Sequence, residues 1–600
     1  MHMRTLSVIV VALLLSMCSI QEETTWAPAA CQLPTRWTNM VIADQPWPEY
    51  PRPGFQREEW INLNGLWQYA IKPADAGKPV TYDGQILVPF AVESCLSGVQ
   101  KKVNKDSLLW YQRTFSVPRT WKNKNVILHF EASDWETHVW INGKEAGMHR
   151  GGYDPFSFDI TSLLGRGNRQ VLTVSVMDPT DAGNQPRGKQ VSNPEGIFYT
   201  PVTGIWQTVW LEPVPEKNIS ECRITTDIDK QTVTFNLQSS GSGNGDYYRI
   251  HILEDSDEII VDSFPVAQGI HSCSLQGARL WDTDNPFLYD ARIKLISRGD
   301  ATDEILTYFG MRKISMVTDP QGINRMALNN KRLFQLGPLD QGFWPDGIYT
   351  PPTDEAMKND LEVTKNLGFN MLRKHVKVEP ERFYYWCDKL GILVWQDMPS
   401  CSGFVGHKDP DMDRTPADAA QFDEELSALI HSRINHPSII VWVPFNEGWG
   451  QYATEKVVNL IREEDTTRLV NQASGWTDRG VGDLKDIHAY PGPAAPQQEK
   501  GRISVLGEFG GLGLAIKDHS WTTKNWGYQE LSDREKLLAR YEELIVELMK
   551  LKYSPGLAAA VYTQTTDVET ESNGLMTYDR EMIKMDADKL REINQQVILH

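Results

Sequence analysis

The chain is poor in cysteine and in basic residues, and both shortages exclude something. Its 600 residues contain 7 Cys in spacings that match no zinc motif, so buried single thiols are favoured. An oxidising compartment would permit disulfides, and Cys222 and Cys273 are then the first candidate pair because they fall in one domain. Basic residues number 60 against 79 acidic ones, a net charge of -19. Such a charge repels phosphate backbones and excludes nucleic acid as a partner.

Long apolar runs are also lacking after the first 17 residues. Near the start, Arg4 precedes the apolar residues 6–17, which fit the core of a signal sequence and are too short to span a membrane. We expect a signal peptide over residues 1–18, no transmembrane span, and an exported protein of the periplasm or bacterial cell surface. Cys18 follows a lipobox-like Leu-Ser-Met, and residues 27–30 offer another cleavage site, so a lipid anchor and a free protein both stay open. No sequence feature specifies an oligomeric state.

Domain organisation follows from the length and from the pattern of apolar runs. At roughly 100 to 200 residues per domain, the length predicts three or four domains. Residues 32–214 are typical of short strands and turns, and Asn142-Gly143 suits a two-residue hairpin turn. A second set of strands over residues 215–315 has the length of one β-sandwich. From residue 316 to 600 apolar runs alternate with helix-periodic segments, which predicts parallel β/α units.

Eight strands can be counted in the last domain. Eight strands in about 285 residues fit a (β/α)8 TIM barrel, in which the loops after the strands carry the chemistry. The predicted strands are residues 333–336, 370–373, 392–396, 439–444, 468–471, 487–488, 504–506 and 558–563.

Two glutamates fall where strands of this barrel end. Glu447 follows the apolar residues 439–445, and Glu508 follows residues 504–507 at the end of the seventh strand. The fourth and seventh strands lie on opposite sides of the barrel mouth. Paired carboxyl groups in a cleft rich in Trp suit glycoside hydrolysis, with one acid to protonate the leaving oxygen and one carboxylate to attack or to activate water. A single glutamate after a strand could be an ordinary solvated loop residue. Two glutamates that each follow an apolar strand are harder to explain in that way.

A set of short motifs carries a family resemblance. They are residues 50–53 (Tyr-Pro-Arg-Pro), 63–67 (Leu-Asn-Gly-Leu-Trp), 88–90 (Val-Pro-Phe), 140–143 (Trp-Ile-Asn-Gly), 309–312 (Phe-Gly-Met-Arg), 433–438 (Arg-Ile-Asn-His-Pro-Ser) and 446–447 (Asn-Glu). With them the chain resembles glycoside hydrolase family 2, which contains β-galactosidases, β-glucuronidases and β-mannosidases. The resemblance covers nearly the whole chain after the signal region. It implies a sugar-binding β jelly roll over residues 32–214, an immunoglobulin-like sandwich over residues 215–315 and a catalytic TIM barrel over residues 316–600.

The resemblance also implies roles for residues at the barrel mouth. Glu447 would be the general acid/base and Glu508 the nucleophile of a retaining mechanism, in which the carboxyl groups lie about 5 to 5.5 Å apart. Asn446 would hold the sugar 2-hydroxyl, Arg373 would keep the nucleophile ionised and Tyr490 would touch it. Physical reasoning agrees, since a nearby guanidinium lowers a carboxyl pKa, whereas Glu447 in an apolar, Trp-rich setting would hold its proton. Further candidate sugar contacts at strand ends are Asp340, Trp344, His375, Asp397, Trp476, His488 and Gln564.

Departures from the family pattern bear on the substrate. Glucuronidases place an Asn-x-Lys pair for the sugar carboxylate where this chain has Glu571-Ser572-Asn573. Because Glu571 would repel a carboxylate, a neutral sugar is expected. Large β-galactosidases place a Glu-x-His metal pair after the third strand, whereas residues 396–400 are Gln-Asp-Met-Pro-Ser. We therefore expect no catalytic metal and no cofactor.

The sequence thus predicts an exo-acting retaining β-glycosidase that removes a terminal neutral sugar, with galactose first, from a carbohydrate substrate. A β-glucuronidase or another family 2 exo-glycosidase is the alternative within this class. A non-catalytic carbohydrate-binding protein that keeps a dead barrel is the alternative outside it. A purely structural surface protein would give no reason for two opposed carboxylates.

Overall fold

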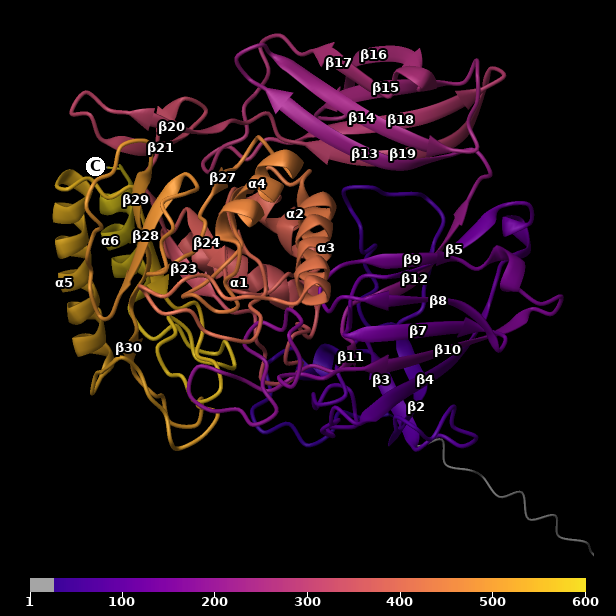
Figure 1. Ribbon diagram of the computed structural model, residues 1–600, viewed down its shortest axis with the longest axis horizontal. Coiled ribbons are helices and arrows are strands. Elements are labelled where there is room, and N and C mark those ends of the chain that lie inside the picture. Colours follow the sequence, from indigo (N-terminus) through magenta and orange to yellow (C-terminus); the bar gives the residue numbers. More distant parts are fainter. Residues whose placement is uncertain (1–25, 600) are drawn as a thin grey trace, which may run out of the picture.

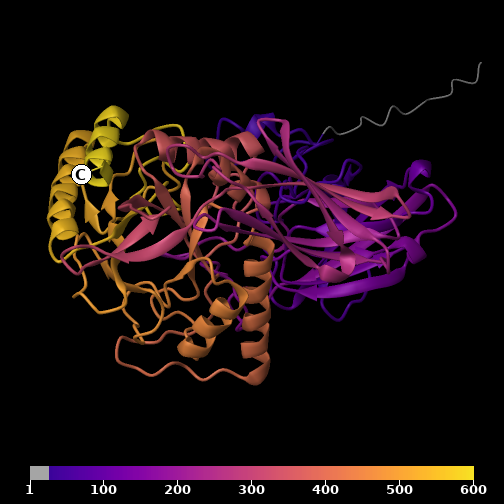
Figure 2. The same ribbon diagram turned by 90° about the horizontal axis from the view of Figure 1, so that it is seen from above.

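The computed structural model describes residues 26–599. The predicted signal peptide and Cys18 therefore lie outside the described residues. Figure 1 shows a β domain in indigo and violet, a second β domain in magenta above it, and a barrel in orange and yellow beside both; Figure 2 shows the same side-by-side arrangement from above. Within residues 26–599, no helix combines the length and the apolar character that crossing a membrane requires.

The first domain is a jelly-roll sandwich of two antiparallel sheets. Its strands are β1 (Ile61–Asn62), β2 (Gly65–Pro73), β3 (Gly84–Val88), β4 (Ser107–Ser116), β5 (Asn125–Phe130), β6 (Ser133–Asp134), β7 (Glu136–Ile141), β8 (Lys144–Arg150), β9 (Phe156–Asp159), β10 (Arg169–Met177), β11 (Gly204–Ile205) and β12 (Val209–Val214). Short 3-10 helices are η1 (Thr38–Met40), η2 (Arg119–Trp121) and η3 (Thr161–Leu163). The two main sheets have the orders β3-β2-β4-β10-β7-β8 and β1-β12-β5-β9, and β11 pairs with β6 in a small third sheet. The predicted hairpin joins β7 to β8, and Asn142 and Gly143 take the positive φ values that its two-residue turn needs.

The second domain is an immunoglobulin-like sandwich. Its elements are β13 (Asn218–Asp227), β14 (Thr232–Ser240), β15 (Tyr247–Glu254), β16 (Asp257–Pro265), η4 (Val266–Gln268), β17 (Ile270–Ser274), β18 (Tyr289–Ser297) and β19 (Asp300–Phe309). Sheets β13-β14-β17 and β16-β15-β18-β19 enclose a separate apolar core. A small sheet of β20 (Ile314–Thr318), β21 (Asn324–Leu328) and β22 (Lys331–Arg332) leads into the barrel.

The third domain is a parallel barrel of eight strands in which six helices follow strands. The strands are β23 (Gln335–Asp340), β24 (Met371–Lys374), β25 (Leu393–Asp397), β26 (Ile439–Val443), β27 (Leu469–Val470), β28 (Leu484–Ala489), β29 (Ile503–Gly510) and β32 (Ala559–Thr563). The helices are α1 (Asp354–Asn366), α2 (Glu381–Leu390), α3 (Pro416–Arg433), α4 (Thr454–Glu464), α5 (Arg534–Tyr553) and α6 (Ala587–Leu599), and β30 (Leu512–Gly513) pairs with β31 (Gln529–Glu530) beside the barrel. This architecture confirms the predicted fold class, and all eight predicted strands overlap observed ones.

The barrel is closed except between β27 and β28. The strand order runs β27-β26-β25-β24-β23-β32-β29-β28, so these two strands are its edges. Polar groups bridge the gap: Asp483 and Val470 exchange hydrogen bonds, and the Asn471 amide donates to Asp486 Oδ2 at 2.7 Å. In the described chain no helix follows β27 or β28, which leaves this side of the barrel covered by loops.

The jelly roll is packed directly against the barrel. The Trp47 indole donates to the Pro351 carbonyl at 3.0 Å, and the Thr350 hydroxyl donates to the Pro89 carbonyl at 3.1 Å. One buried apolar cluster continues from Phe90 and Trp206 of the jelly roll into the barrel side. Loops of the first domain can therefore reach the barrel mouth.

The cysteine pattern differs from the candidate pairing. Cys31 and Cys95 form a disulfide within the jelly-roll region, a bond that the sequence did not predict. Cys222 and Cys273 are free and buried, which agrees with the favoured interpretation of single thiols and not with their pairing. They lie on β13 and β17, two strands that β14 separates.

Peptide mapping tests this assignment. Digestion of the unreduced protein, alkylated under denaturing conditions, should yield a crosslinked peptide that contains Cys31 and Cys95. Cys222 and Cys273 should both carry the alkyl group, because burial rather than bonding protects them in the folded chain. The reduced sample is the control, and a crosslink between Cys222 and Cys273 would contradict the assignment.

Candidate active site

The two predicted glutamates meet at the carboxyl end of the barrel. Glu508 belongs to the last part of β29, and Glu447 lies four residues after the end of β26. One oxygen of each carboxylate and a ring nitrogen of His488 all lie within 4.8 Å of one another. The two opposed strands therefore bring the pair of carboxyl groups together, as the sequence predicts.

Glu508 lies in a strongly cationic setting. The Arg373 guanidinium donates to its Oε1 at 3.1 Å, and the Tyr490 hydroxyl donates to its Oε2 at 2.5 Å. Burial opposes ionisation of Glu508, but the charges of His488, His375, Arg373 and Lys189 outweigh it and lower its pKa to about 2. Burial also lowers the pKa of His375 well below its usual value, so at neutral pH the charge comes from the other groups. Glu508 is thus an ionised carboxylate near pH 7.

Arg373 links Glu508 to two other strand ends. Its guanidinium is fully buried and donates two hydrogen bonds to Asp397, at 3.0 and 2.8 Å. It also donates to Asn446 Oδ1 at 2.7 Å. The amide nitrogen of Asn446 has no hydrogen-bond partner among the described residues, although it is buried. Arg373 therefore orients Asn446 so that a free donor remains for another group.

Glu447 lies in a more polar setting than the sequence suggests. Its backbone takes φ +50°, a strained value for a non-glycine residue, and its amide donates to the Ser474 carbonyl at 2.8 Å. Its Oε1 lies 2.8 Å from His488 Nδ1. His488 Nε2 lies 2.8 Å from the Ser474 hydroxyl, which donates to Asp486 at 2.6 Å. A chain of hydrogen bonds therefore starts at this carboxyl.

The direction of this chain determines what His488 can do. Because the Ser474 hydroxyl donates to Asp486, its oxygen accepts from His488 Nε2–H, and Nδ1 is left facing Glu447. Burial opposes protonation of His488, but Glu508, Glu447 and Asp486 outweigh it and raise its pKa. Protonated His488 therefore donates its Nδ1–H to Glu447 Oε1. The His488 side chain is fully buried, so it positions Glu447 and does not offer the direct sugar contact that was expected.

The other predicted contacts divide into two groups. Trp476 stays partly exposed near the site, with its ring edge toward His488. His375 and Asp340 are buried at the mouth, where His375 contacts Asp397 and Asp340 pairs with Lys374. Three residues have structural surroundings instead. Asp397 is held by Arg373, Gln564 is bonded to Gln341 and Asn573, and Trp344 packs in the core against Trp37 and Arg580.

Trp344 is therefore a correction. It is 2% exposed and belongs to a small apolar cluster, so no sugar face can stack on it. Position at a strand end did not distinguish it from Trp476, because the direction of a side chain in a loop depends on tertiary packing.

Sequence reasoning missed two residues that the jelly roll contributes. Tyr199 donates its hydroxyl to the Glu571 carboxylate, and Lys189 lies over the rings of Tyr199 and Trp449. Both come from the segment between β10 and β11. Spacing along the chain could not reveal them, since the barrel residues they meet are more than 200 positions away.

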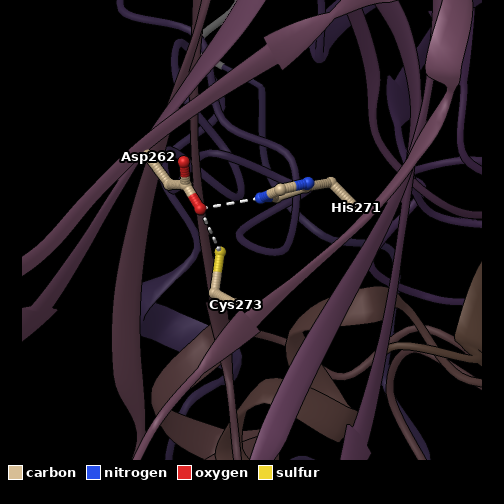
Figure 3. Close-up of side chains that lie close together, drawn as sticks. All are labelled: Asp262, His271 and Cys273. Carbon is tan, nitrogen blue, oxygen red and sulfur yellow. Dashed lines mark hydrogen bonds and ion pairs between the residues drawn. The ribbon is translucent and has the colours of Figure 1, made fainter.

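Two clusters combine side chains of metal-ligand type. One is the Glu447, His488 and Glu508 group itself. The other lies in the sandwich, where Asp262 Oδ2 of β16 is 2.7 Å from His271 Nε2 and 4.0 Å from Cys273 Sγ of β17 (Figure 3). Burial raises the pKa of the Cys273 thiol to about 11. Asp262 and His271 satisfy each other as a hydrogen-bonded pair, beside a protonated thiol.

A TIM barrel with two opposed glutamates at its mouth defines a class of carbohydrate-active proteins. Three family models match this chain: "Glycosyl hydrolases family 2, sugar binding domain" over residues 82–211, "Glycosyl hydrolases family 2" over residues 217–312, and "Glycosyl hydrolases family 2, TIM barrel domain" over residues 351–491. The chain belongs to glycosyl hydrolase family 2.

Its relatives carry two different activities in their names. A putative beta-glucuronidase of Formosa agariphila is 26% identical over 413 residues, which cover 67% of this chain and 48% of that protein. A beta-galactosidase of Thermoanaerobacter pseudethanolicus is 25% identical over 454 residues, covering 72% and 57%. The chain thus spans about half the length of these curated relatives. The beta-D-glucuronidase structure of Dictyoglomus thermophilum, with TM-score 0.71, 18% identity and coverage of 90% and 98%, shows the shared fold.

The buried charge of Arg373 makes a prediction about stability. In Arg373→Met, Glu508 and Asp397 would be buried without their cation, which should cost about 3 to 5 kcal/mol. The folded-state pKa of Glu508 would then rise above its unfolded value, so the loss should be largest at pH 7.5 and smaller at pH 5. Urea unfolding at the two pH values measures this.

The matched control is Arg150→Met, at an exposed arginine that also has an ion pair. This control should lose at most about 1 kcal/mol at either pH. An equal loss for Arg373→Met at both pH values would contradict the assigned role.

Proposed function

We propose that this chain is an exo-acting retaining β-glycosidase. The observation that carries the proposal is the approach of the Glu447 and Glu508 carboxyl oxygens to within 4.8 Å of each other. Retaining enzymes hold the two groups about 5 to 5.5 Å apart, whereas inverting enzymes need about 6.5 to 9.5 Å to admit a water. Because this is the separation of one oxygen from each group, it is compatible with the retaining spacing and is the geometric basis for proposing direct attack by one carboxylate.

The protonation states support a division of roles. Glu508, with its pKa of about 2, is ionised and would attack the anomeric carbon, forming a bond as the bond to the leaving oxygen breaks. Glu447 would give a proton to that leaving oxygen, and His488, whose Nδ1 lies 2.8 Å from its Oε1, is the neighbouring group that can supply it. In the second half, Glu447 would remove a proton from water, and that water would displace Glu508 from the anomeric carbon. The free amide donor of Asn446 is placed to hold a sugar hydroxyl.

We also propose that the protein is exported to the periplasm or cell surface. The apolar residues 6–17 support this proposal. The Cys31–Cys95 disulfide adds support, because such bonds persist in oxidising compartments.

The sugar has two candidates. A neutral sugar, with galactose first, follows from the sequence because Glu571 would repel a carboxylate. A specific observation favours the second candidate, a β-glucuronide: Glu571 is not free to face a substrate. It is buried, and its carboxylate accepts from Tyr199 and from the Asn573 amide, the latter at 2.9 Å. The rates of hydrolysis of 4-nitrophenyl β-D-galactoside and 4-nitrophenyl β-D-glucuronide distinguish the two candidates. Faster hydrolysis of the galactoside supports the neutral sugar, and faster hydrolysis of the glucuronide supports the second candidate.

Two variants test the roles of the glutamates. Glu508→Ala should lose activity on every aryl β-glycoside, by at least about 10⁴-fold, because the covalent step is removed. Glu447→Ala should retain activity on 2,4-dinitrophenyl glycosides, whose leaving group needs little protonation, and azide should accelerate it. The azide product of Glu447→Ala should be the β-anomer, and that of Glu508→Ala the α-anomer, identified by NMR.

An inverted azide product from Glu447→Ala would exclude it as the acid/base. Absence of hydrolysis of any glycoside by the wild-type chain would instead support the carbohydrate-binding alternative.

A further inference from the structure

A loop segment of the jelly roll, residues 187–190, is fixed against the barrel mouth. It lies between β10 and β11. The amides of Arg187 and Gly188 both donate to the Ser400 carbonyl, at 2.9 and 3.0 Å, in the loop that follows β25. The Gln190 side chain donates to Asp134 and Tyr153 inside the jelly roll. Hydrogen bonds from both domains therefore fix the segment of residues 187–190.

Gly188 shows how closely the two domains approach. Its φ is +63°, and a Cβ there would lie 2.5 Å from the Val376 carbonyl oxygen of the loop after β24. Only glycine can occupy this position without displacing backbone. The next residue, Lys189, is consequently delivered to a defined place.

Lys189 is the exception among the buried lysines. Four lysines are buried in the described part of the chain. Lys374 and Lys377 pair with Glu379, and Lys584 pairs with Asp567. Lys189 is only 5% exposed, yet the structure gives it neither an ion pair nor a side-chain hydrogen bond within residues 26–599. Because its nitrogen has no hydrogen-bond partner in the described chain and is not a fully buried atom, it keeps contact with solvent, where a ligand can supply an anion.

The surroundings of this ammonium are those of a sugar site. Its nitrogen lies 5.6 Å from the ring centroid of Tyr199 and 5.9 Å from that of Trp449, two residues beyond Glu447. It is also close enough to Glu508 and His375 to lower the pKa of both. Two aromatic walls, an unpartnered cation and the proposed nucleophile thus share one region.

We propose that Lys189 is the specificity-determining residue of this site, and that it binds an anionic group, a carboxylate or a sulfate ester, on the terminal sugar. The proposal rests on the proposed glycosidase function and deepens it. A charge-assisted hydrogen bond to such a group needs a donor that no protein acceptor already occupies, and Lys189 is such a donor. The jelly roll would then supply the selection for charge.

The test compares anionic with neutral substrates. Wild type, Lys189→Met, Lys189→Arg and the exposed control Lys144→Met are assayed on 4-nitrophenyl β-D-glucuronide, 6-sulfo-β-D-galactoside and β-D-galactoside. Wild type should prefer one anionic glycoside, and which one distinguishes carboxylate from sulfate. Lys189→Met should lower kcat/KM for it on the order of 10- to 100-fold.

The neutral galactoside is the internal control. Its kcat/KM should fall far less in Lys189→Met than that of the anionic glycoside, because Arg373 and His488 still hold Glu508 ionised. Lys189→Arg should restore part of the loss, and Lys144→Met should behave as wild type. An equal loss on all three substrates would overturn the proposal and make Lys189 a positioning residue for Glu508. A wild-type preference for galactoside would overturn it too, while leaving the proposed function intact.

Binding provides a readout that does not need turnover. Calorimetric titration of wild type and Lys189→Met with glucuronic acid, galactose 6-sulfate and galactose should show a loss confined to an anionic sugar. If wild type hydrolyses nothing, the proposed function fails, but this binding difference still decides the role of Lys189. Equal binding by the two proteins would overturn it.

Discussion

The barrel mouth is organised around one buried charge, the guanidinium of Arg373. Because arginine stays protonated at any pH the protein meets, burying it is costly unless anions surround it. Asp397 accepts two of its N–H groups, Glu508 accepts one and Asn446 accepts another. The ends of β25, β26 and β29 are therefore drawn toward β24. Removing this charge would change where the reacting groups lie as well as their protonation.

Charge balance then explains the rest of the site. Arg373 faces two carboxylates, Asp397 and Glu508, so the group carries one excess negative charge. His488, whose pKa is raised by the neighbouring carboxylates, offers one positive charge close to this excess. His375 remains neutral. Each protonation state thus depends on its neighbours, and the low pKa of Glu508 belongs to the whole group.

Strands that bury only apolar side chains were the easiest to predict. β26 is apolar throughout, begins at the predicted residue 439 and ends one residue before the predicted 444. β23 spans Gln335–Asp340, whereas the predicted strand is residues 333–336. The prediction stops early because Gly337 and Pro338 are usually read as the end of a strand. A Cβ at Gly337 would lie 1.8 Å from the Met371 carbonyl oxygen, so the close packing of β24 requires glycine there. Rules that treat Gly and Pro as strand breakers cannot foresee this contact.

Which site residues could be predicted from the sequence also depends on contacts between distant parts of the chain. Glu447, Glu508, Arg373 and Tyr490 all follow from strand ends or from the family resemblance, and the structure brings them together. Lys189 and Tyr199 come from another domain, and only the packing of the jelly roll on the barrel places them there. Likewise β28 begins at Leu484, whereas the predicted strand is residues 487–488. A charged residue argues against a buried strand in the sequence, but Asp486 is buried here because Asn471 and Ser474 donate hydrogen bonds to it.

One of the motifs that carry the family resemblance, residues 433–438, has no side chain among the proposed reacting groups, and its contacts show a structural role. Asn435 pairs with the backbone of β13 through Cys222 and Ile224. His436 and the Ser438 amide both bind Asp388, which also accepts the Tyr308 hydroxyl of the sandwich. The sandwich thereby anchors the start of β26, and the other end of that strand leads to Glu447. A string without catalytic chemistry therefore holds the strand that presents the proposed acid.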